Sequence, residues 1–194
     1  MTKPSFVFAL VEDRRQEQFL YRFLLLGGMR RDEIAIDVSP KAHGAAESWV
    51  RENFARYAKK CRTRNARAAT GMFVMLDADR GSVREHLGEL DAALLASGQH
   101  RIDPKKDNVA RLIPKWSVET WVLFMSAKSS GEPSVREDVP YKDTKTSEQW
   151  SALLPQAVLT LYQWMENPAV RPVGLLDSLQ AAIQEIPCAL PEGR

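Results

Sequence analysis

The chain has 194 residues, of which 44% are hydrophobic and 27% are charged. This composition argues against an intrinsically disordered protein and suits one compact domain with its own core. The formal net charge of +2 is near balance, so the overall field does not indicate a nucleic-acid partner. Cys61 and Cys188 have no CxxC spacing, which argues against a disulfide framework or a zinc cluster and favours a reducing compartment.

The N-terminal residues run directly into a short apolar stretch that reaches Glu12 too soon for the hydrophobic region of a signal peptide. No apolar run in the sequence approaches the length that spans a bilayer. We therefore expect a cytoplasmic protein that contacts no membrane.

Short apolar runs alternate with helical patterns through the first two-thirds of the chain. The runs of strand length cover residues 5–11, 33–38, 71–76 and 109–113. Each run is followed by apolar residues at helical spacing, in residues 14–26, 45–60, 83–96 and 117–127. The resulting βαβαβαβα order predicts an α/β fold with a Rossmann-like, mostly parallel four-stranded sheet and flanking helices.

The character of the sequence changes after Lys128. Residues 129–147 are polar and rich in Pro, Lys and Asp, which predicts a loop that orders around a ligand or partner. Residues 148–165 and 173–186 show helical patterns. We therefore predict an α/β domain over 1–128, a polar loop over 129–147, and a C-terminal helical extension over 148–194 packed on the same domain.

Acidic residues follow two of the predicted strands. Glu12 and Asp13 end the first, and Asp77 and Asp79 end the third. In parallel α/β sheets the carboxyl ends of the strands share one edge, where ligands collect, so Glu12, Asp77 and Asp79 are expected to converge. Crowded carboxylates repel one another and favour a divalent cation, Mg²⁺ or Mn²⁺. The alternative is that these acids only cap the helices that follow.

This arrangement resembles the TOPRIM domain of topoisomerases, primases and the overcoming-lysogenization-defect nucleases. The resemblance is carried by Phe6-Val-Phe-Ala-Leu-Val-Glu12 and by Met72-Phe-Val-Met-Leu-Asp77-Ala-Asp79, and it covers roughly residues 5–127. It implies that Glu12 is a general acid/base or metal ligand and that Asp77 and Asp79 bind Mg²⁺. Many TOPRIM proteins have Gly where this chain has Asp13, so Asp13 is a further candidate for the site.

A second segment, from Leu112-Ile-Pro-Lys-Trp to Glu119-Thr-Trp, is similar to a stretch in small stand-alone TOPRIM-like proteins, several of which belong to phage-defence systems. The resemblance implies that Glu119 is a further site acid, although an acid in the first turn of a helix is also favoured by the helix dipole. Related nucleases use a late lysine to stabilise charge on the phosphate, and Lys142 and Lys145 are the candidates here.

The most basic stretch of the chain extends from Arg56 to Arg67 without an acid. Its cations are candidate phosphate contacts, or else a solvated helix end. His43, in the loop after the second predicted strand, is a weaker candidate for the same role. The predicted nucleic-acid-binding residues are Lys59, Lys60, Arg62, Arg64, Arg67 and His43.

The leading hypothesis is a metal-dependent phosphoryl-transfer enzyme, a TOPRIM-like nuclease acting on DNA or RNA, in antiviral defence by the resemblance. Glu12, Glu119, Lys142 and Lys145 are its predicted catalytic residues. The alternative is a non-catalytic nucleic-acid-binding or regulatory subunit that works with an ATPase or other partner protein, or as a homo-oligomer. A two-component receiver is a third interpretation, weakened because the strand-end Thr/Ser and the Lys-Pro pair of receivers are not found.

Overall fold

A computed structural model of the chain describes residues 4–40, 45–130, 135–141 and 146–190. Its strands and helices are β1 (Phe6–Val11), α1 (Arg14–Leu26), η1 (Arg31–Glu33), β2 (Ile34–Val38), α2 (Ala46–Asn65), β3 (Thr70–Met75), α3 (Val83–Ala96), β4 (Val109–Leu112), α4 (Val118–Ser130), α5 (Thr146–Glu166), η2 (Pro168–Val170) and α6 (Asp177–Ala189). Within the described residues, no helix has the length and apolarity needed to cross a membrane.

The four strands form one sheet in the order β2-β1-β3-β4, and every neighbouring pair is parallel. This confirms the predicted α/β fold with a parallel four-stranded sheet. The strand order reverses direction between β1 and β3, so the topological switch point lies between these two strands. Ligands of open α/β sheets bind at the carboxyl ends of the strands at such a point, and these are the ends after which Glu12 and Asp77 lie.

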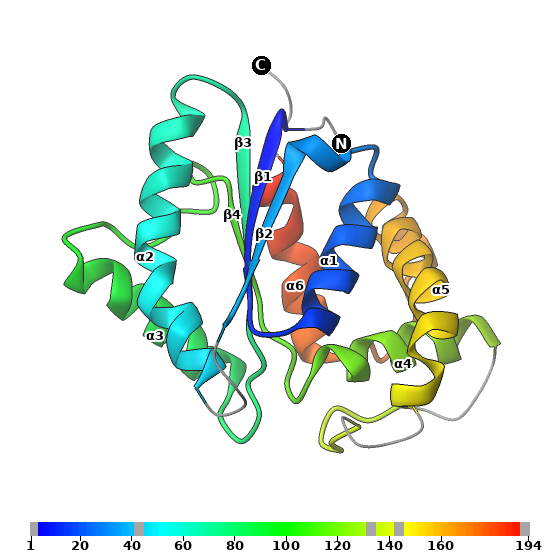
Figure 1. Ribbon diagram of the computed structural model, residues 1–194. Coiled ribbons are helices and arrows are strands. Elements are labelled where there is room, and N and C mark those ends of the chain that lie inside the picture. The colour runs from blue at the N-terminus through cyan, green and yellow to red at the C-terminus, as the bar shows by residue number, and fades with distance from the viewer. Residues whose placement is uncertain (1–3, 41–44, 131–134, 142–145, 191–194) are drawn as a thin grey trace.

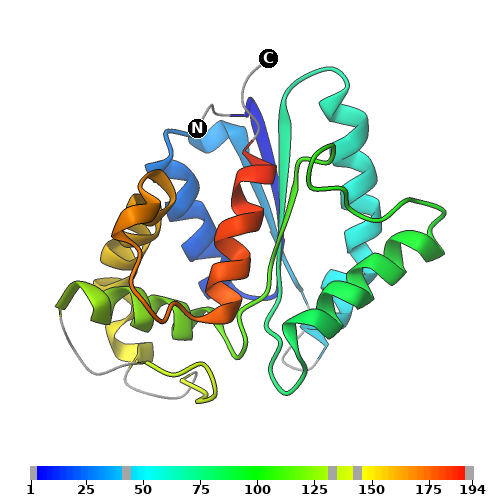
Figure 2. The ribbon, with the colours of Figure 1, turned by 180° about the vertical axis from the view of Figure 1, so that it is seen from behind.

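Helices cover both faces of the sheet (Figure 1). On one face, α2 and α3 pack over β1 and β3 around a core that includes Phe54 and Leu90. On the other face, α1, α4, α5 and α6 share a second core that includes Phe19, Trp121 and Ile183. Figure 2 shows α6 lying against the back of the sheet. The division of the chain into 1–128, 129–147 and 148–194 remains a prediction.

The helices that follow β1 and β3 begin at side-chain caps. Asp13 accepts hydrogen bonds from the backbone N–H groups of Arg15 (2.9 Å) and Gln16 (3.0 Å), which satisfies donors that have no partner within the helix. Ser82 and Glu85 form a reciprocal capping box at the start of α3. Asp13 therefore acts on the backbone of α1, which is the capping role that the sequence left open.

Two helix boundaries differ from the prediction. Helix α2 continues to Asn65 because Cys61 is buried and Arg62 bonds to the opposite loop, so packing stabilises a stretch that lacks apolar periodicity. Helix α6 begins at Asp177 rather than at Val173, because Gly174 adopts a positive φ of 78° and forms a turn.

Candidate functional site

Glu12 and Asp77 meet at the topological switch point. The carboxylate oxygen Oε2 of Glu12 accepts a hydrogen bond of 2.9 Å from the backbone N–H of Asp77, which joins the ends of β1 and β3. Asp77 is 2% exposed, and Glu12 is half-buried. The convergence of two acids that are far apart in sequence therefore follows from the parallel pairing of β1 with β3.

Gln16, in the first turn of α1, holds these two carboxylates in place. Its side-chain Nε2 donates to Oδ1 of Asp77 at 2.8 Å and lies 3.5 Å from Oε2 of Glu12. Its Oε1 accepts from the backbone N–H of Glu12 at 2.9 Å. The side chain is fully buried, and the sequence analysis missed it. The available signal was its position four residues after Glu12, one turn along the helix that leaves the site.

Asp79 takes a different position from Asp77. It is exposed and has a φ of 45°, the left-handed conformation that Asp tolerates better than most residues. Backbone conformations of this kind concentrate at functional sites. Among the described residues, Asp79 does not form a close group of three ligands with Glu12 and Asp77. The site as described therefore has a buried pair, with Asp79 on the loop beyond it.

Lys115 is a cation at this edge that the sequence analysis did not select. Its Nζ donates to the backbone oxygens of Asp79 (3.2 Å) and Gly81 (2.6 Å), so it ties the loop after β4 to the loop after β3. A second link joins the same loops, because the N–H of Ala78 donates to the oxygen of Pro114 at 2.8 Å. The signal available in the sequence was a lysine shortly after a strand end, on the strand next to β3.

Glu119 is buried in the first turn of α4 and is paired with a cation. Its side chain is 1% exposed, and Oε1 accepts a hydrogen bond from Nη1 of Arg15. The guanidinium of Arg15 also lies over the ring of Trp150, 5.7 Å from its centroid. The negative charge of Glu119 is therefore compensated within the protein, and this pair joins α4 to the first turn of α1.

Unsatisfied polar atoms concentrate near the same edge of the sheet. Trp116 Nε1, Ser117 Oγ and Thr120 Oγ1 surround the start of α4, and His86 Nδ1 lies in α3. All four are buried without a hydrogen-bond partner. Each such atom costs about 1–3 kcal/mol, and proteins mainly accept this cost at functional sites. Stability alone does not explain this edge.

Comparisons with known proteins leave the family open. A scan of protein-family models finds no match to the chain, and searches of curated proteins and of solved structures find no significant match either. The resemblance to TOPRIM domains therefore rests on the residues that carry it, and it is taken forward as a proposal.

The predicted basic stretch lies at the opposite end of the sheet. A shallow groove of about 410 Å³ is lined by Arg56, Lys59, Lys60, Thr63, Arg64 and Arg67. The Lys60 ammonium lies 4.2 Å from the ring centroid of Phe8, and the Arg64 guanidinium lies 4.2 Å from that of Phe6. The groove therefore lies along the amino-terminal half of β1, whereas Glu12 follows its carboxyl end (Figure 1).

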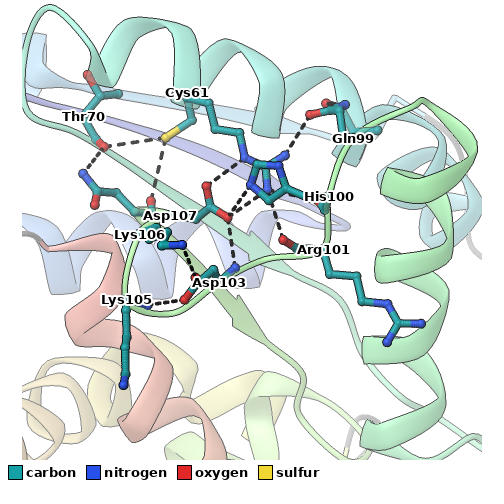
Figure 3. A network of polar contacts seen from close by, with 12 residues as sticks. Cys61, Thr70, Gln99, His100, Arg101, Asp103, Lys105, Lys106 and Asp107 are labelled. Atoms are coloured by element: carbon teal, nitrogen blue, oxygen red, sulfur yellow. Dashed lines mark hydrogen bonds and ion pairs between the residues drawn. The ribbon is translucent and has the colours of Figure 1, made fainter.

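Arg62 differs from its neighbours because its guanidinium bonds within the protein. Nε and Nη2 each donate to one carboxylate oxygen of Asp107 at 2.8 Å, and Nη1 donates to Gln99 at 3.0 Å. Asp107 lies among these contacts and also accepts from the N–H of Asp103 (Figure 3). Arg62 could contact a phosphate only by breaking this network, so the proposals below do not use it.

Replacing Arg62 should destabilise the fold. Burial alone would raise the pKa of Asp107, but the hydrogen bonds from Arg62 and Asp103 and the charge of Arg62 lower it overall. We expect Arg62→Met to reduce the free energy of unfolding by about 2–3 kcal/mol at pH 7, because a carboxylate that is 6% exposed loses its partner.

The pH dependence of this loss distinguishes the ion pair from lost packing. A carboxyl with a lowered folded-state pKa stabilises the fold above its ordinary pKa of 3.8, and that contribution is lost as the pH falls through the folded-state pKa. In urea unfolding, the deficit of Arg62→Met should therefore shrink towards pH 3. The exposed Arg67→Met is the matched control and should change stability by less than about 0.5 kcal/mol. A deficit that does not vary with pH would contradict the assignment.

Cys61 should be chemically inert in the folded protein. It is 1% exposed, and burial, with a smaller contribution from the charge of Asp107, raises its pKa to about 12; the thiol lies beside Thr70 (Figure 3). At pH 8, iodoacetamide should modify Cys61 only after unfolding and should reach the half-buried Cys188 first. Peptide mass mapping measures this order, with both thiols reacting in urea as the control. Equal rates in the folded protein would contradict it.

Three predicted site residues, His43, Lys142 and Lys145, lie outside the described residues. Their roles stay predictions. Lys115 is the lysine that the described part of the chain brings to the loops after β3 and β4.

Proposed function

We propose that this chain is a TOPRIM-like, metal-dependent nuclease that cleaves DNA or RNA. The observation that carries the proposal is the hydrogen-bonded pairing of Glu12 with Asp77 across the switch point between β1 and β3. Two carboxylates held together at the edge where α/β proteins bind their ligands form an oxygen-rich site of the type that Mg²⁺ and Mn²⁺ prefer.

The residues present fit such an ion. Glu12 and Asp77 would be its protein ligands, and each carboxylate oxygen has two lone-pair directions, so the bonds from Gln16 and from the backbone leave coordination geometrically open. Mg²⁺ usually keeps several waters and takes only one or two carboxylates, which suits a site of this size. When bound, the ion would polarise a phosphoryl oxygen and lower the pKa of a bound water.

The chain's own side chains would then position the ligands and move the proton. Gln16 fixes the orientation of both carboxylates, so little reorganisation is needed when an ion or substrate binds. Glu12 is the half-buried member of the pair and is the candidate general base. Asp79, on the exposed loop, would face the ion through water or meet the substrate from outside. Lys115 places a cation beside that loop.

The basic groove would hold the nucleic acid away from the cut. Six residues of extended strand separate Phe6 from Glu12, or about 20 Å, which is about six rises of 3.4 Å along one strand of a duplex. A substrate must therefore extend roughly six nucleotides beyond the scissile phosphate to reach Lys60 and Arg64. Shorter oligonucleotides should be cut less efficiently, and high salt should weaken binding of the longer ones.

Cleavage of nucleic acid by the purified chain tests the proposal. Single- and double-stranded DNA and structured RNA are incubated with Mg²⁺ or Mn²⁺, and product formation is compared between the wild type and Glu12→Gln. We expect cleavage of at least one substrate class and a loss of about 100-fold or more in the variant, equivalent to about 2.7 kcal/mol of transition-state stabilisation. Asp32→Asn, an exposed acid paired with Arg30, is the control and should cleave normally. No cleavage, or equal cleavage by Glu12→Gln, would contradict the proposal.

One observation favours the second candidate function, a non-catalytic module. The carboxylate of Glu119 already bonds to Arg15, so a predicted catalytic acid is committed within the protein. The chain would then bind metal or nucleic acid and contribute to a complex in which an ATPase or another subunit supplies turnover. Mg²⁺ affinity without cleavage, together with cleavage restored by a co-purified partner, would favour this function.

A further inference from the structure

His86 lies directly behind the loop that connects Asp77 to Asp79. The residue belongs to α3 and is 7% exposed. Its Nε2 lies 3.2 Å from the backbone oxygen of Ala78, which acts only as an acceptor, so Nε2 carries the proton and donates. A Cβ on Gly81 would lie 2.7 Å from Nε2. The histidine therefore fits into a space that exists only because residue 81 is glycine.

The opposite ring nitrogen faces two carboxylates. His86 Nδ1 lies 3.1 Å from Oε1 of Glu47, in α2, and 2.9 Å from Oε2 of Glu89, in α3. It nevertheless makes no hydrogen bond, although it is buried. With the proton on Nε2, the lone pair of Nδ1 points towards two anions. This arrangement is unfavourable unless a cation lies between them.

The spacing of these three atoms matches a metal site. Ligands at about 2.0–2.1 Å from a tetrahedral Zn²⁺ are about 3.3 Å apart, close to the 2.9 and 3.1 Å observed. Among the described residues, this is the group of three potential ligands that lie within 4.8 Å of one another. A metal-bound histidine characteristically donates its other N–H to a carbonyl or carboxylate, and the oxygen of Ala78 fills that position.

Arg51 competes for the same two oxygens. Its Nη1 lies 3.1 Å from Oε1 of Glu47 and 2.6 Å from Oε2 of Glu89. Its side chain is 29% exposed, so the guanidinium can move into solvent when an ion enters. An ion at this position would replace one positive charge with two beside a pair of carboxylates.

We propose that Glu47, His86 and Glu89 form a second metal site, distinct from Glu12 and Asp77, that binds Zn²⁺ in exchange for Arg51. One imidazole and two carboxylates suit Zn²⁺ better than Mg²⁺, which prefers oxygen ligands alone. Three protein ligands leave a fourth position for water. Through the bond from Nε2 to Ala78, the ion would also stiffen the loop that carries Asp77 and Asp79.

Calorimetric titration with Zn²⁺ tests this site, in the presence of millimolar Mg²⁺ to occupy the oxygen site. We expect wild type to bind one Zn²⁺, and His86→Ala to bind it at least about 100-fold more weakly. Glu89→Gln, at a side chain that is 45% exposed, keeps the fold and should also lose affinity. Arg51→Met should bind about fivefold more tightly, because two ion pairs no longer oppose the metal. Glu12→Gln should bind Zn²⁺ normally, which separates this site from the nuclease proposal.

His100→Ala is the matched control, since this histidine is 69% exposed and lies away from the site; it should leave Zn²⁺ affinity unchanged. The proposal is overturned if Zn²⁺ affinity is the same in wild type, His86→Ala and Glu89→Gln. It is also overturned if neither wild type nor Arg51→Met binds Zn²⁺, which would mean that the cluster is a protonated histidine in an ion-pair network.

Discussion

Asp77→Asn is expected to reduce metal-dependent cleavage by roughly 100-fold to 1000-fold while leaving the protein folded. The substitution keeps the size of the side chain, and its oxygen can still accept the bond of 2.8 Å from Gln16. It removes the negative charge at the ligand that is 2% exposed, where no solvent can replace it. Metal ions contribute several kcal/mol of charge stabilisation in such sites, and 1.36 kcal/mol corresponds to a factor of ten in rate.

The measurement is the single-turnover cleavage rate at saturating Mn²⁺, with thermal unfolding recorded on the same samples. Asp91→Asn removes an acid of α3 that pairs with Arg111, and its cleavage rate should match wild type. If Asp77→Asn cleaved as fast as wild type, Asp77 would have no role in catalysis.

The second large effect is on stability: Gly71→Ala should cost about 3 kcal/mol. Gly71 lies in β3 directly under the last turn of α6, and a Cβ there would lie 1.9 Å from the backbone oxygen of Ala189. Real Cβ atoms do not approach within 3.0 Å of another atom. Because the obstruction is backbone, α6 must move away from the sheet, which disrupts the core that α6 shares with β3 and β4.

Urea unfolding measures this effect, with an unchanged m-value indicating that the denatured state is unaffected. Gly88→Ala is the control, because Gly88 lies inside α3 with no atom within 4 Å of the added Cβ. That substitution should stabilise the protein by about 0.5–1 kcal/mol, as alanine does in a helix interior. If Gly71→Ala were as stable as wild type, α6 would not pack against β3 as described.

The fold could be predicted from the sequence because each strand is a continuous apolar run that ends at a charged or turn residue. In a fully parallel sheet both faces of a strand are buried, so β1 and β3 are apolar at every position. The boundaries of α2 and α6 could not be predicted. They depend on Arg62 bonding to a distant loop and on the turn at Gly174.

The candidate site was only partly predictable. Parallel strands bring their carboxyl ends together, so the meeting of Glu12 and Asp77 follows from the strand assignment. The contributions of Gln16, Lys115 and His86 depend on side-chain directions across elements, and a single sequence carries no signal for these. Asp79 was expected beside Asp77, but a left-handed backbone at this residue leaves it on the exposed loop.

Anomalous diffraction from crystals soaked in Mn²⁺ tests the central claim most directly. We expect an anomalous peak between the carboxylates of Glu12 and Asp77, and its loss in crystals of Asp77→Asn. A peak confined to Glu47, His86 and Glu89, or the same peak in wild type and Asp77→Asn, would contradict a metal site at the junction of β1 and β3.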